Sequence, residues 1–263
     1  MPRYLGQHFL NNPEIVDKII EASQIQPTDI VIEIGPGEGV LTEKICPLAH
    51  KVLAIELDHK LADTLEGKFS QQQNLEIIFD DILKVNLPQL LADRNIQNYK
   101  IIANIPYYIT SKIIRLFLET AHQPTELVLM IQKEVAQRIV APVGKMSLLS
   151  TSVQYYAQAE ILFDVTKENF NPPPKVDSSV IKISHIQKNN PLEDKDFFRV
   201  VKAGFCARRK TLANNLANSF HLDKKQIEAT LEKAGLSPNT RAQELSIENW
   251  QNLAVLFDKK MTH

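Results

Sequence analysis

The tetrapeptide Asn104-Ile105-Pro106-Tyr107 places an amide and a backbone carbonyl before a proline and an aromatic ring. The amide oxygen of Asn104 and the carbonyl of Ile105 can accept the two N–H groups of an exocyclic base amine such as N6 of adenine, with the backbone held by Pro106. Both hydrogen bonds strengthen as the attacking amine becomes positive. Tyr107 can stack on the base. A strand-ending turn is the alternative, because Asn and Pro are common in turns.

A glycine-rich stretch from Gly35 to Gly39 follows the apolar strand predicted at 29–34 and precedes a helical start at Val40. A strand, a glycine turn and a helix open a nucleotide-binding unit, in which the backbone of glycines such as Gly37 lies close to the ligand. Gly39 comes four residues after Gly35, whereas a dinucleotide fingerprint needs its third glycine five residues after the first. The pattern is instead similar to the first motif of S-adenosylmethionine-dependent methyltransferases.

Two further predicted strands end in carboxylates. The strand at 51–55 ends at Glu56, which lies 21 residues after Gly35 and is placed to accept the ribose hydroxyls of an adenosine. The strand at 75–79 ends in Asp80 and Asp81, and Asp81 is the candidate acceptor for the adenine amine of a cofactor. Spacing alone does not exclude Asp80. The carboxyl ends of parallel strands share one rim of a sheet, which predicts a single site.

A loop with three consecutive prolines, 169–178, is expected to be stiff and extended, and to hold Phe170 across the target base from Tyr107. A proline-rich connector with a buried Phe is the alternative. Arg208, Arg209 and Lys210 stand beside hydroxyl and amide side chains, which predicts a phosphate-contacting cluster. A solvated helix face is the alternative there.

The elements that position these residues indicate an α/β fold. Apolar runs predict strands at 100–103 and 126–131, and the segments 151–163 and 178–185 are predicted to form an antiparallel pair that closes the sheet. Helical spacing predicts helices at the ranges 13–23, 109–118, 133–140, 194–205, 223–234 and 246–258. After 189–191 the pattern is purely helical, which predicts one domain at 1–186 and a smaller all-helical domain at 187–263.

Composition limits the class of protein. Hydrophobic residues make up 44% and charged residues 23%, and the net charge is −1. Residues 186–263 carry 13 of the 30 basic and 9 of the 31 acidic residues, which puts the positive charge toward the C-terminal end. Cys46 and Cys206 lie far apart, and no spacing typical of metal ligands occurs. No apolar run of membrane-spanning length and no export signal is recognised, so we expect a cytoplasmic, monomeric protein without a bound metal.

Together these segments resemble the ribosomal RNA adenine N6-dimethyltransferase family, and most closely its bacterial small-subunit branch. The motifs that carry the resemblance span nearly the whole chain, and their order and spacing are specific. They are Gly6 to Leu10, Glu33 to Gly37, Ile55 to Asp58, Asn104 to Tyr107, Gln132 to Val135, Phe170 to Ser178, Arg208 to Leu212 and Arg241 to Ser246.

The resemblance implies a Rossmann-like S-adenosylmethionine methyltransferase sheet. It implies transfer of two methyl groups to each of two adjacent adenosines near the 3′ end of small-subunit (16S) rRNA, within an immature ribosomal subunit. The cofactor contacts expected from the resemblance and from the glycine loop are His8, Leu10, Gly35, Gly37, Glu56, Asp81 and Asn104. We also expect Lys175, in the proline-rich motif, to contact RNA.

The chain departs from the family pattern at two places. Three other functions are alternatives to small-subunit rRNA methylation. Position 8 is usually Asn in the family, and Met146 to Leu149 replaces a segment that contains Tyr and Gly. One rival is a large-subunit rRNA methyltransferase conferring antibiotic resistance. A second is a DNA-adenine or protein-glutamine methyltransferase, which usually has Pro in place of Ile105. The third is a non-enzymatic assembly factor.

Overall fold

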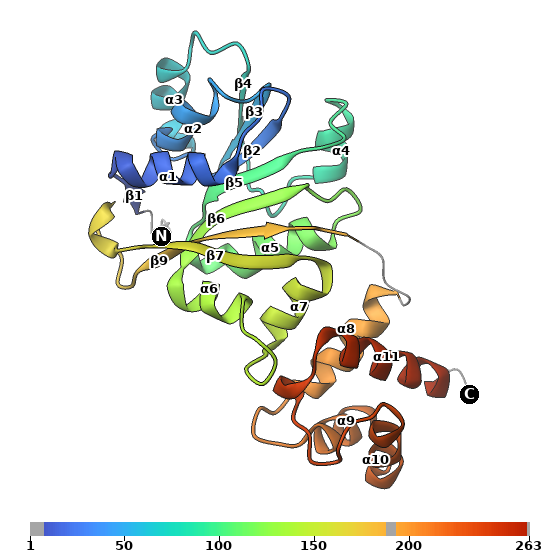
Figure 1. Cartoon of the computed structure of the whole chain (residues 1–263). Coiled ribbons are helices and arrows are strands. Elements are labelled where there is room, and N and C mark those ends of the chain that lie inside the picture. The colour runs from blue at the N-terminus through green and yellow to red at the C-terminus, as the bar shows by residue number, and fades with distance from the viewer. Residues whose placement is uncertain (1–7, 188–192, 262–263) are drawn as a thin grey trace. The chain divides into compact units, whose positions relative to one another are not determined.

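The α/β part of the protein is built on a seven-stranded sheet in the order β4-β3-β2-β5-β6-β9-β7 (Figure 1). The computed structural model describes residues 8–187 and 193–261, of which 258–261 only as backbone. The predicted boundary at 189–191 and the motif residues Gly6 and Gln7 lie outside these ranges. The strands are β2 (Ile30–Ile34), β3 (Lys51–Glu56), β4 (Leu75–Phe79), β5 (Lys100–Asn104), β6 (Glu126–Gln132), β7 (Gln158–Val165) and β9 (Ser178–Ser184).

The sheet changes winding direction between β2 and β5. Strands β4, β3, β2, β5 and β6 are mutually parallel. The chain moves outward from β2 through β3 to β4, and then returns to β5 on the other side of β2. The carboxyl ends of β2 and β5 therefore flank the switch point, where ligands of open α/β sheets bind.

The predicted antiparallel pair at the edge of the sheet is confirmed. Strand β9 pairs antiparallel with both β6 and β7, with Ile181 opposite Ile161 on β7. The predicted strand at 151–163 is wrong in its first half, because Leu148–Tyr156 forms helix α7. Tyr and β-branched residues in this segment favour a strand locally, but here Ser147 caps the helix by accepting the N–H of Ser150.

The central strands form because their apolar runs are buried on both faces of the sheet. Val31 and Ile102 belong to one contiguous core with Val16 of α1 and Leu41 of α2. The helices of this part are α1 (Pro13–Ser23), α2 (Val40–Ile45), α3 (Ala62–Lys68), α4 (Leu87–Ala92), α5 (Thr110–Glu119) and α6 (Lys133–Ile139). Asn12 begins α1 by accepting the N–H of Glu14 at 2.9 Å.

A second, two-stranded sheet joins the N-terminal segment to the proline-rich loop. Strand β1 (Phe9–Leu10) pairs antiparallel with β8 (Phe170–Asn171), and Leu10 lies opposite Phe170. The backbone N–H of Asn11 also donates to the carbonyl of Asn169 at 3.0 Å. Three short 3₁₀-helices complete the described elements of this part: η1 (His59–Leu61), η2 (Tyr107–Ile109) and η3 (Lys167–Asn169).

The chain forms two compact units, and the second is helical. The first comprises residues 1–137 and 157–186, and the second comprises 138–156 and 187–263. The expected domains differ from these units in one respect, since 138–156 belongs with the helices. The physical reason is aromatic packing: Tyr155 of α7 stacks on Phe197 with ring centroids 3.8 Å apart. The other elements are α8 (Asp194–Gly204), α9 (Leu212–Phe220), α10 (Lys224–Lys233), η4 (Ala242–Glu244) and α11 (Ile247–Met261).

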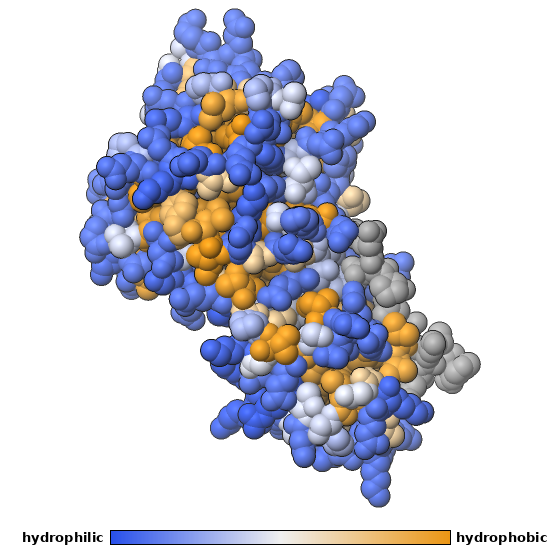
Figure 2. All heavy atoms as spheres, in the orientation of Figure 1, coloured by the Kyte–Doolittle hydropathy of each residue, from blue (hydrophilic) through white to orange (hydrophobic). Residues whose placement is uncertain are grey.

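An apolar stripe on α11 forms the core of the helical unit. Trp250, Leu253 and Phe257 are fully buried. Gly204 at the end of α8 leaves no room for a side chain, because Trp250 and Leu212 stand against its Cα. Hydrophilic side chains cover most of the visible surface of each unit, with apolar patches between them (Figure 2).

Candidate functional site

The glycine loop after β2 forms one wall of a cleft in the α/β unit. Gly35, Gly37 and Gly39 have φ values of +67°, +60° and +77°, a left-handed conformation that favours glycine. A Cβ on Gly35 would meet no atom within 4 Å and would project into open space. Gly37 and Gly39 instead lie against the rings of Phe9 and Phe69. Gly35 therefore leaves its backbone accessible to a ligand.

The cleft has about 780 Å³ of empty space, including the part open to solvent. Most predicted site residues of this unit line it. They are His8, Leu10, Gly35, Gly37, Glu56, Asn104, Ile105, Pro106, Tyr107 and Phe170. Five segments far apart in the sequence thus meet around one cavity.

An adjoining cavity of about 450 Å³ shares Gly35, Glu56 and Pro106 with the first. Asp80 and Asp81 both line it. Asp81 is partly buried and accepts the N–H of Leu83 at 3.0 Å, whereas Asp80 is exposed and accepts the N–H of Asp81 at 2.7 Å. Apolar side chains including Ile82 and Ile109 form the rest of the wall, as suits a flat aromatic ring.

Glu56 is held rigidly between two backbone amides. One carboxylate oxygen accepts the N–H of Gly37 at 3.0 Å, and the other accepts the N–H of Asp58 at 2.8 Å. Only 3% of the residue is exposed. Each carboxylate oxygen can accept a further hydrogen bond, so this carboxylate is oriented to receive a pair of hydroxyl groups.

Glu33 is a site residue that the sequence reasoning missed. It lines the main cavity, is buried, and accepts a hydrogen bond from the hydroxyl of Thr42 at 2.6 Å. The pKa of the Glu33 carboxyl is raised to about 7, because the effect of burial and the smaller effect of the nearby charge of Glu56 outweigh the lowering by the hydrogen bond from Thr42. The available sequence signal was its position two residues before Gly35, at the start of the motif Glu33 to Gly37.

The Asn104–Tyr107 segment leaves the sheet at the end of β5. Asn104 lies opposite Met130 of β6, and the N–H of Ile105 donates to the Met130 carbonyl at 3.2 Å. Tyr107 then begins η2, and its hydroxyl lies 2.8 Å from the hydroxyl of Ser178. Burial raises the pKa of the Tyr107 phenol. The segment is therefore anchored to the sheet at both of its ends.

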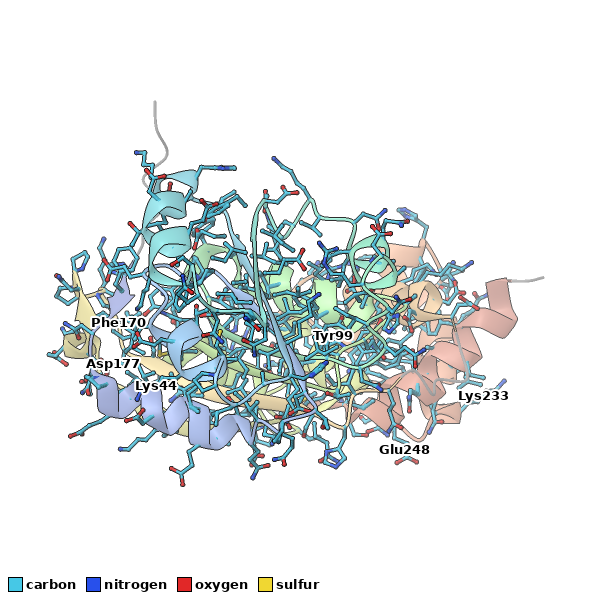
Figure 3. The ribbon with its side chains drawn as sticks, turned by 90° about the horizontal axis from the view of Figure 1, so that it is seen from above. Lys44, Tyr99, Phe170, Asp177, Lys233 and Glu248 are labelled. Atoms are coloured by element: carbon cyan, nitrogen blue, oxygen red, sulfur yellow. The ribbon has the colours of Figure 1, made fainter. Side chains whose placement is uncertain are left out.

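Phe170 and His8 approach Tyr107 from the two-stranded ribbon. Phe170 is 3% exposed and lines the same cavity as Tyr107. In Figure 3, Phe170 and Asp177, at the two ends of the proline-rich loop, lie at the same end of the sheet, away from Tyr99. The His8 ring stacks on Tyr107 with centroids 6.3 Å apart, and its Nδ1 lies 2.7 Å from the Pro172 carbonyl. His8 thus contacts the aromatic wall as well as the cavity.

The predicted RNA-binding residues belong to different units. Arg208, Arg209 and Lys210 are exposed in the turn between α8 and α9, and none forms an ion pair with the described residues. Lys175 is exposed beside a surface groove of the α/β unit. Asp177 lines the same groove and accepts the N–H of Lys167 at 3.1 Å.

No cluster of three or more His, Cys, Asp and Glu side chains within 8–187 and 193–261 is arranged to hold a metal ion. Among the helices in those ranges, none combines the length and the apolar character needed to cross a bilayer.

The chain is similar to proteins that are named as ribosomal RNA methyltransferases. The family described as ribosomal RNA adenine dimethylase matches residues 2–259. A ribosomal RNA small subunit methyltransferase A from Dehalococcoides mccartyi is 44% identical over 255 residues, which cover 96% of this chain and 87% of the relative. A solved dimethyladenosine transferase from Plasmodium falciparum is 30% identical with a TM-score of 0.82, covering 97% of this chain and 98% of that chain. The solved 23S rRNA methyltransferase ErmE is 26% identical with a TM-score of 0.74, covering 95% and 99%.

Proposed function

Because this chain belongs to the ribosomal RNA adenine dimethylase family, we propose that the cleft between the ends of β2 and β5 brings a flipped rRNA adenine to S-adenosylmethionine. The predicted fold class, a Rossmann-like methyltransferase sheet with a helical C-terminal unit, is confirmed. The enzyme is an S-adenosylmethionine-dependent rRNA (adenine-N6,N6)-dimethyltransferase of the small subunit. Its targets are two adjacent adenosines near the 3′ end of 16S rRNA.

The residues of the cleft fit the cofactor. Gly35 presents open space where a side chain would otherwise project, and the carboxylate of Glu56, fixed by two backbone N–H groups, would accept the ribose hydroxyls. Asp81, which lines the adjoining cavity, would accept the adenine amine of the cofactor. His8, Leu10, Gly37 and Asn104 complete the lining. When bound, S-adenosylmethionine supplies a methyl group that is already activated on a positively charged sulfur.

The target amine is held by the end of β5. The Asn104 amide oxygen and the Ile105 carbonyl accept its two N–H groups, and these bonds strengthen as positive charge develops on the nitrogen. Tyr107 stacks on one face of the adenine, and Phe170 forms the opposite wall. The observation that supports this arrangement most is that Asn104 to Tyr107, Glu56 and Phe170 line one cavity at the switch point of the sheet.

RNA recognition outside the pocket is assigned to basic residues of both units. Arg208, Arg209 and Lys210 are exposed cations without ion-pair partners among the described residues, which makes them available to phosphates. Lys175 follows the prolines of the loop that carries Phe170, so it stands close in sequence to the target wall. We infer further that the protein acts as a monomer, in the cytoplasm, on an immature small subunit.

The test is a methylation map. Purified protein and isotopically labelled cofactor are incubated with unmethylated small subunits, with naked 16S rRNA and with 23S rRNA, and the modified nucleosides are located. We expect dimethyladenosine at two adjacent positions near the 3′ end of 16S rRNA, formed in subunits. Label only in 23S rRNA would instead support the large-subunit alternative, to which the similarity of ErmE points.

A further inference from the structure

Tyr107 is held at its hydroxyl by a residue that cannot move independently of the sheet. The Tyr107 oxygen lies 2.8 Å from Ser178 Oγ, in a hydrogen bond for which either hydroxyl can be the donor. Ser178 has no exposed surface. It begins β9, where it lies opposite Gln132 of β6 and Val165 of β7. Two neighbouring strands therefore fix the position of the Ser178 side chain.

The Tyr107 ring needs such support because its own backbone lies beyond the end of strand β5, outside the sheet. It begins η2 directly after the sheet ends at Asn104, and its neighbour Tyr108 is 61% exposed. The Tyr107 ring also stacks on His8 at 6.3 Å, but His8 lies beside the two-stranded ribbon. The hydrogen bond to Ser178 is thus the link between the Tyr107 ring and the central sheet.

We propose that Ser178 is a positioning residue for methyl transfer, which fixes the Tyr107 ring so that a stacked adenine presents N6 to Asn104 and Ile105. The inference rests on the proposed role of Tyr107 in base stacking. Methyl transfer requires an in-line approach, and misplacement of a reacting group by about 1 Å can cost about a hundred-fold in rate. A ring that rotates freely would still bind the base, but it would hold the amine out of line for part of the time.

A double-mutant cycle on the full-length enzyme tests the coupling. Ser178→Ala, Tyr107→Phe and the double variant are assayed with unmethylated small subunits under saturating cofactor. Loss of one hydrogen bond should lower kcat about three- to ten-fold in each single variant, with KM changed by less than about two-fold. The double variant should be no slower than the slower single variant, because both changes remove the same interaction.

Ser179→Ala is the matched control. Ser179 is the next residue of β9, is equally buried, and donates to Asp164 at 2.6 Å rather than to the site. The substitution removes the same atom from the same strand, so it reports the cost to the sheet alone. Thermal unfolding and cofactor affinity are measured for every variant, and the Ser179 variant should keep the wild-type kcat.

Two results would overturn the inference. The first is a wild-type kcat in Ser178→Ala, and the second is a double variant whose loss is the product of the two single losses. Tyr107→Ala separates this inference from the proposed function. If Tyr107→Ala is inactive while Tyr107→Phe and Ser178→Ala are fully active, only the positioning role fails. If Tyr107→Ala itself keeps full activity, the stacking role of Tyr107 fails.

Discussion

Glu33 and Glu56, near the ends of the neighbouring strands β2 and β3, have different surroundings. These surroundings decide which of the two carboxyls is a fixed hydrogen-bond acceptor and which has a raised pKa. Glu56 accepts two backbone N–H groups, which orient it as a fixed acceptor. Glu33 is buried with a single hydroxyl partner, Thr42. Burial is the largest cause that raises its carboxyl pKa from 4.5 to about 7, so Glu33 changes charge near neutral pH.

The raised pKa predicts a pH-dependent contribution to stability. Between about pH 4.5 and pH 7 the folded protein keeps a proton on Glu33 that the unfolded chain has lost. The contribution of Glu33 to stability is therefore present at low pH and is lost as the pH rises through about 7. Glu33→Gln cannot ionise, so its free energy of unfolding relative to wild type should rise from pH 5 to pH 8 by up to about 3 kcal/mol.

Urea unfolding of the cofactor-free protein at both pH values measures this difference. Glu43→Gln is the control, because Glu43 is exposed and its pKa is lowered by the hydrogen bond to Lys68. An equal pH dependence in wild type and in the Glu33 variant would contradict the assignment.

Asn104 carries a prediction of its own, because its amide oxygen is one of two acceptors proposed for the target amine. Asn104→Ala should keep cofactor affinity within a few-fold and lose most methyl transfer, on the order of a hundred-fold or more in kcat, as for other preorganised acceptors and donors. Single-turnover rates and calorimetric cofactor affinity separate the two effects. Unchanged turnover would rule out the proposed mechanism. A dead variant that still supports subunit maturation would favour an additional assembly role.

At the scale of elements, the turn between α8 and α9 concentrates positive charge in the helical unit. Exchange of Arg208, Arg209 and Lys210 for Gln should weaken subunit binding and reduce the slope of log affinity against log salt, by about 0.7 to 0.9 for each phosphate that is no longer neutralised. The matched control exchanges Lys224, Lys225 and Lys233 of α10, which removes the same charge from another element. An unchanged salt slope in the first variant would show that this turn is not a phosphate site.

The same turn is hydrogen-bonded to a second one that also carries a cation. The N–H of Leu212, after the basic run, donates to the carbonyl of Thr240 at 2.8 Å, next to the exposed Arg241. Gln243 in turn accepts the N–H groups of Gly144 and Met146, on either side of Lys145. Figure 1 shows the corresponding loops on one side of the helical unit.

Because these turns are neighbours, we expect Lys145 and Arg241 to add to the proposed phosphate-contacting cluster of Arg208, Arg209 and Lys210. Lys145→Gln with Arg241→Gln should weaken subunit binding and lower the salt slope, by less than the triple variant does. Filter binding at several salt concentrations provides the measurement. If the double substitution changes neither the affinity nor the salt slope, Lys145 and Arg241 do not contact phosphates.

For the whole molecule, the division into units follows packing rather than chain order. Helix α7 precedes β7 in sequence, yet Tyr155 and Tyr156 pack with Phe197 and Phe198 of α8. The N–H of Gln187 also donates to the carbonyl of Tyr156 at 3.0 Å. A chain that ends at the predicted domain boundary would therefore keep α7 but lose Phe197 and Phe198, on which α7 packs.

This predicts the behaviour of a truncated protein. A chain that ends at residue 187 should expose the Tyr155 and Tyr156 rings, bind a hydrophobic dye and unfold with a less cooperative transition than the full chain. A second truncated chain with both tyrosines exchanged for Ser should bind less dye. Full cooperativity and no dye binding in the first chain would show that 138–156 does not depend on the helical unit.

The central sheet and the residues at its rim were predictable from the sequence. Strands buried on both faces need continuous apolar runs, and these are local features that end where Glu56, Asp81 and Asn104 begin the polar rim. The order of the motifs also indicated the family. Spacing left Asp80 and Asp81 unresolved, and both still line the adjoining cavity in the structure.

Only the tertiary structure decided which distant residues meet. The assignment of 138–156 to the helical unit depends on Phe197, and the support of Tyr107 depends on Ser178, 71 residues away. The pKa of Glu33 depends on burial by surrounding segments. Contacts of this kind have no local pattern, because they arise from packing between elements whose sequences are independent of each other. Glu56, Asp81 and Asn104 were therefore predictable as residues of the rim, whereas the burial of Glu33 and the contact between Ser178 and Tyr107 were not.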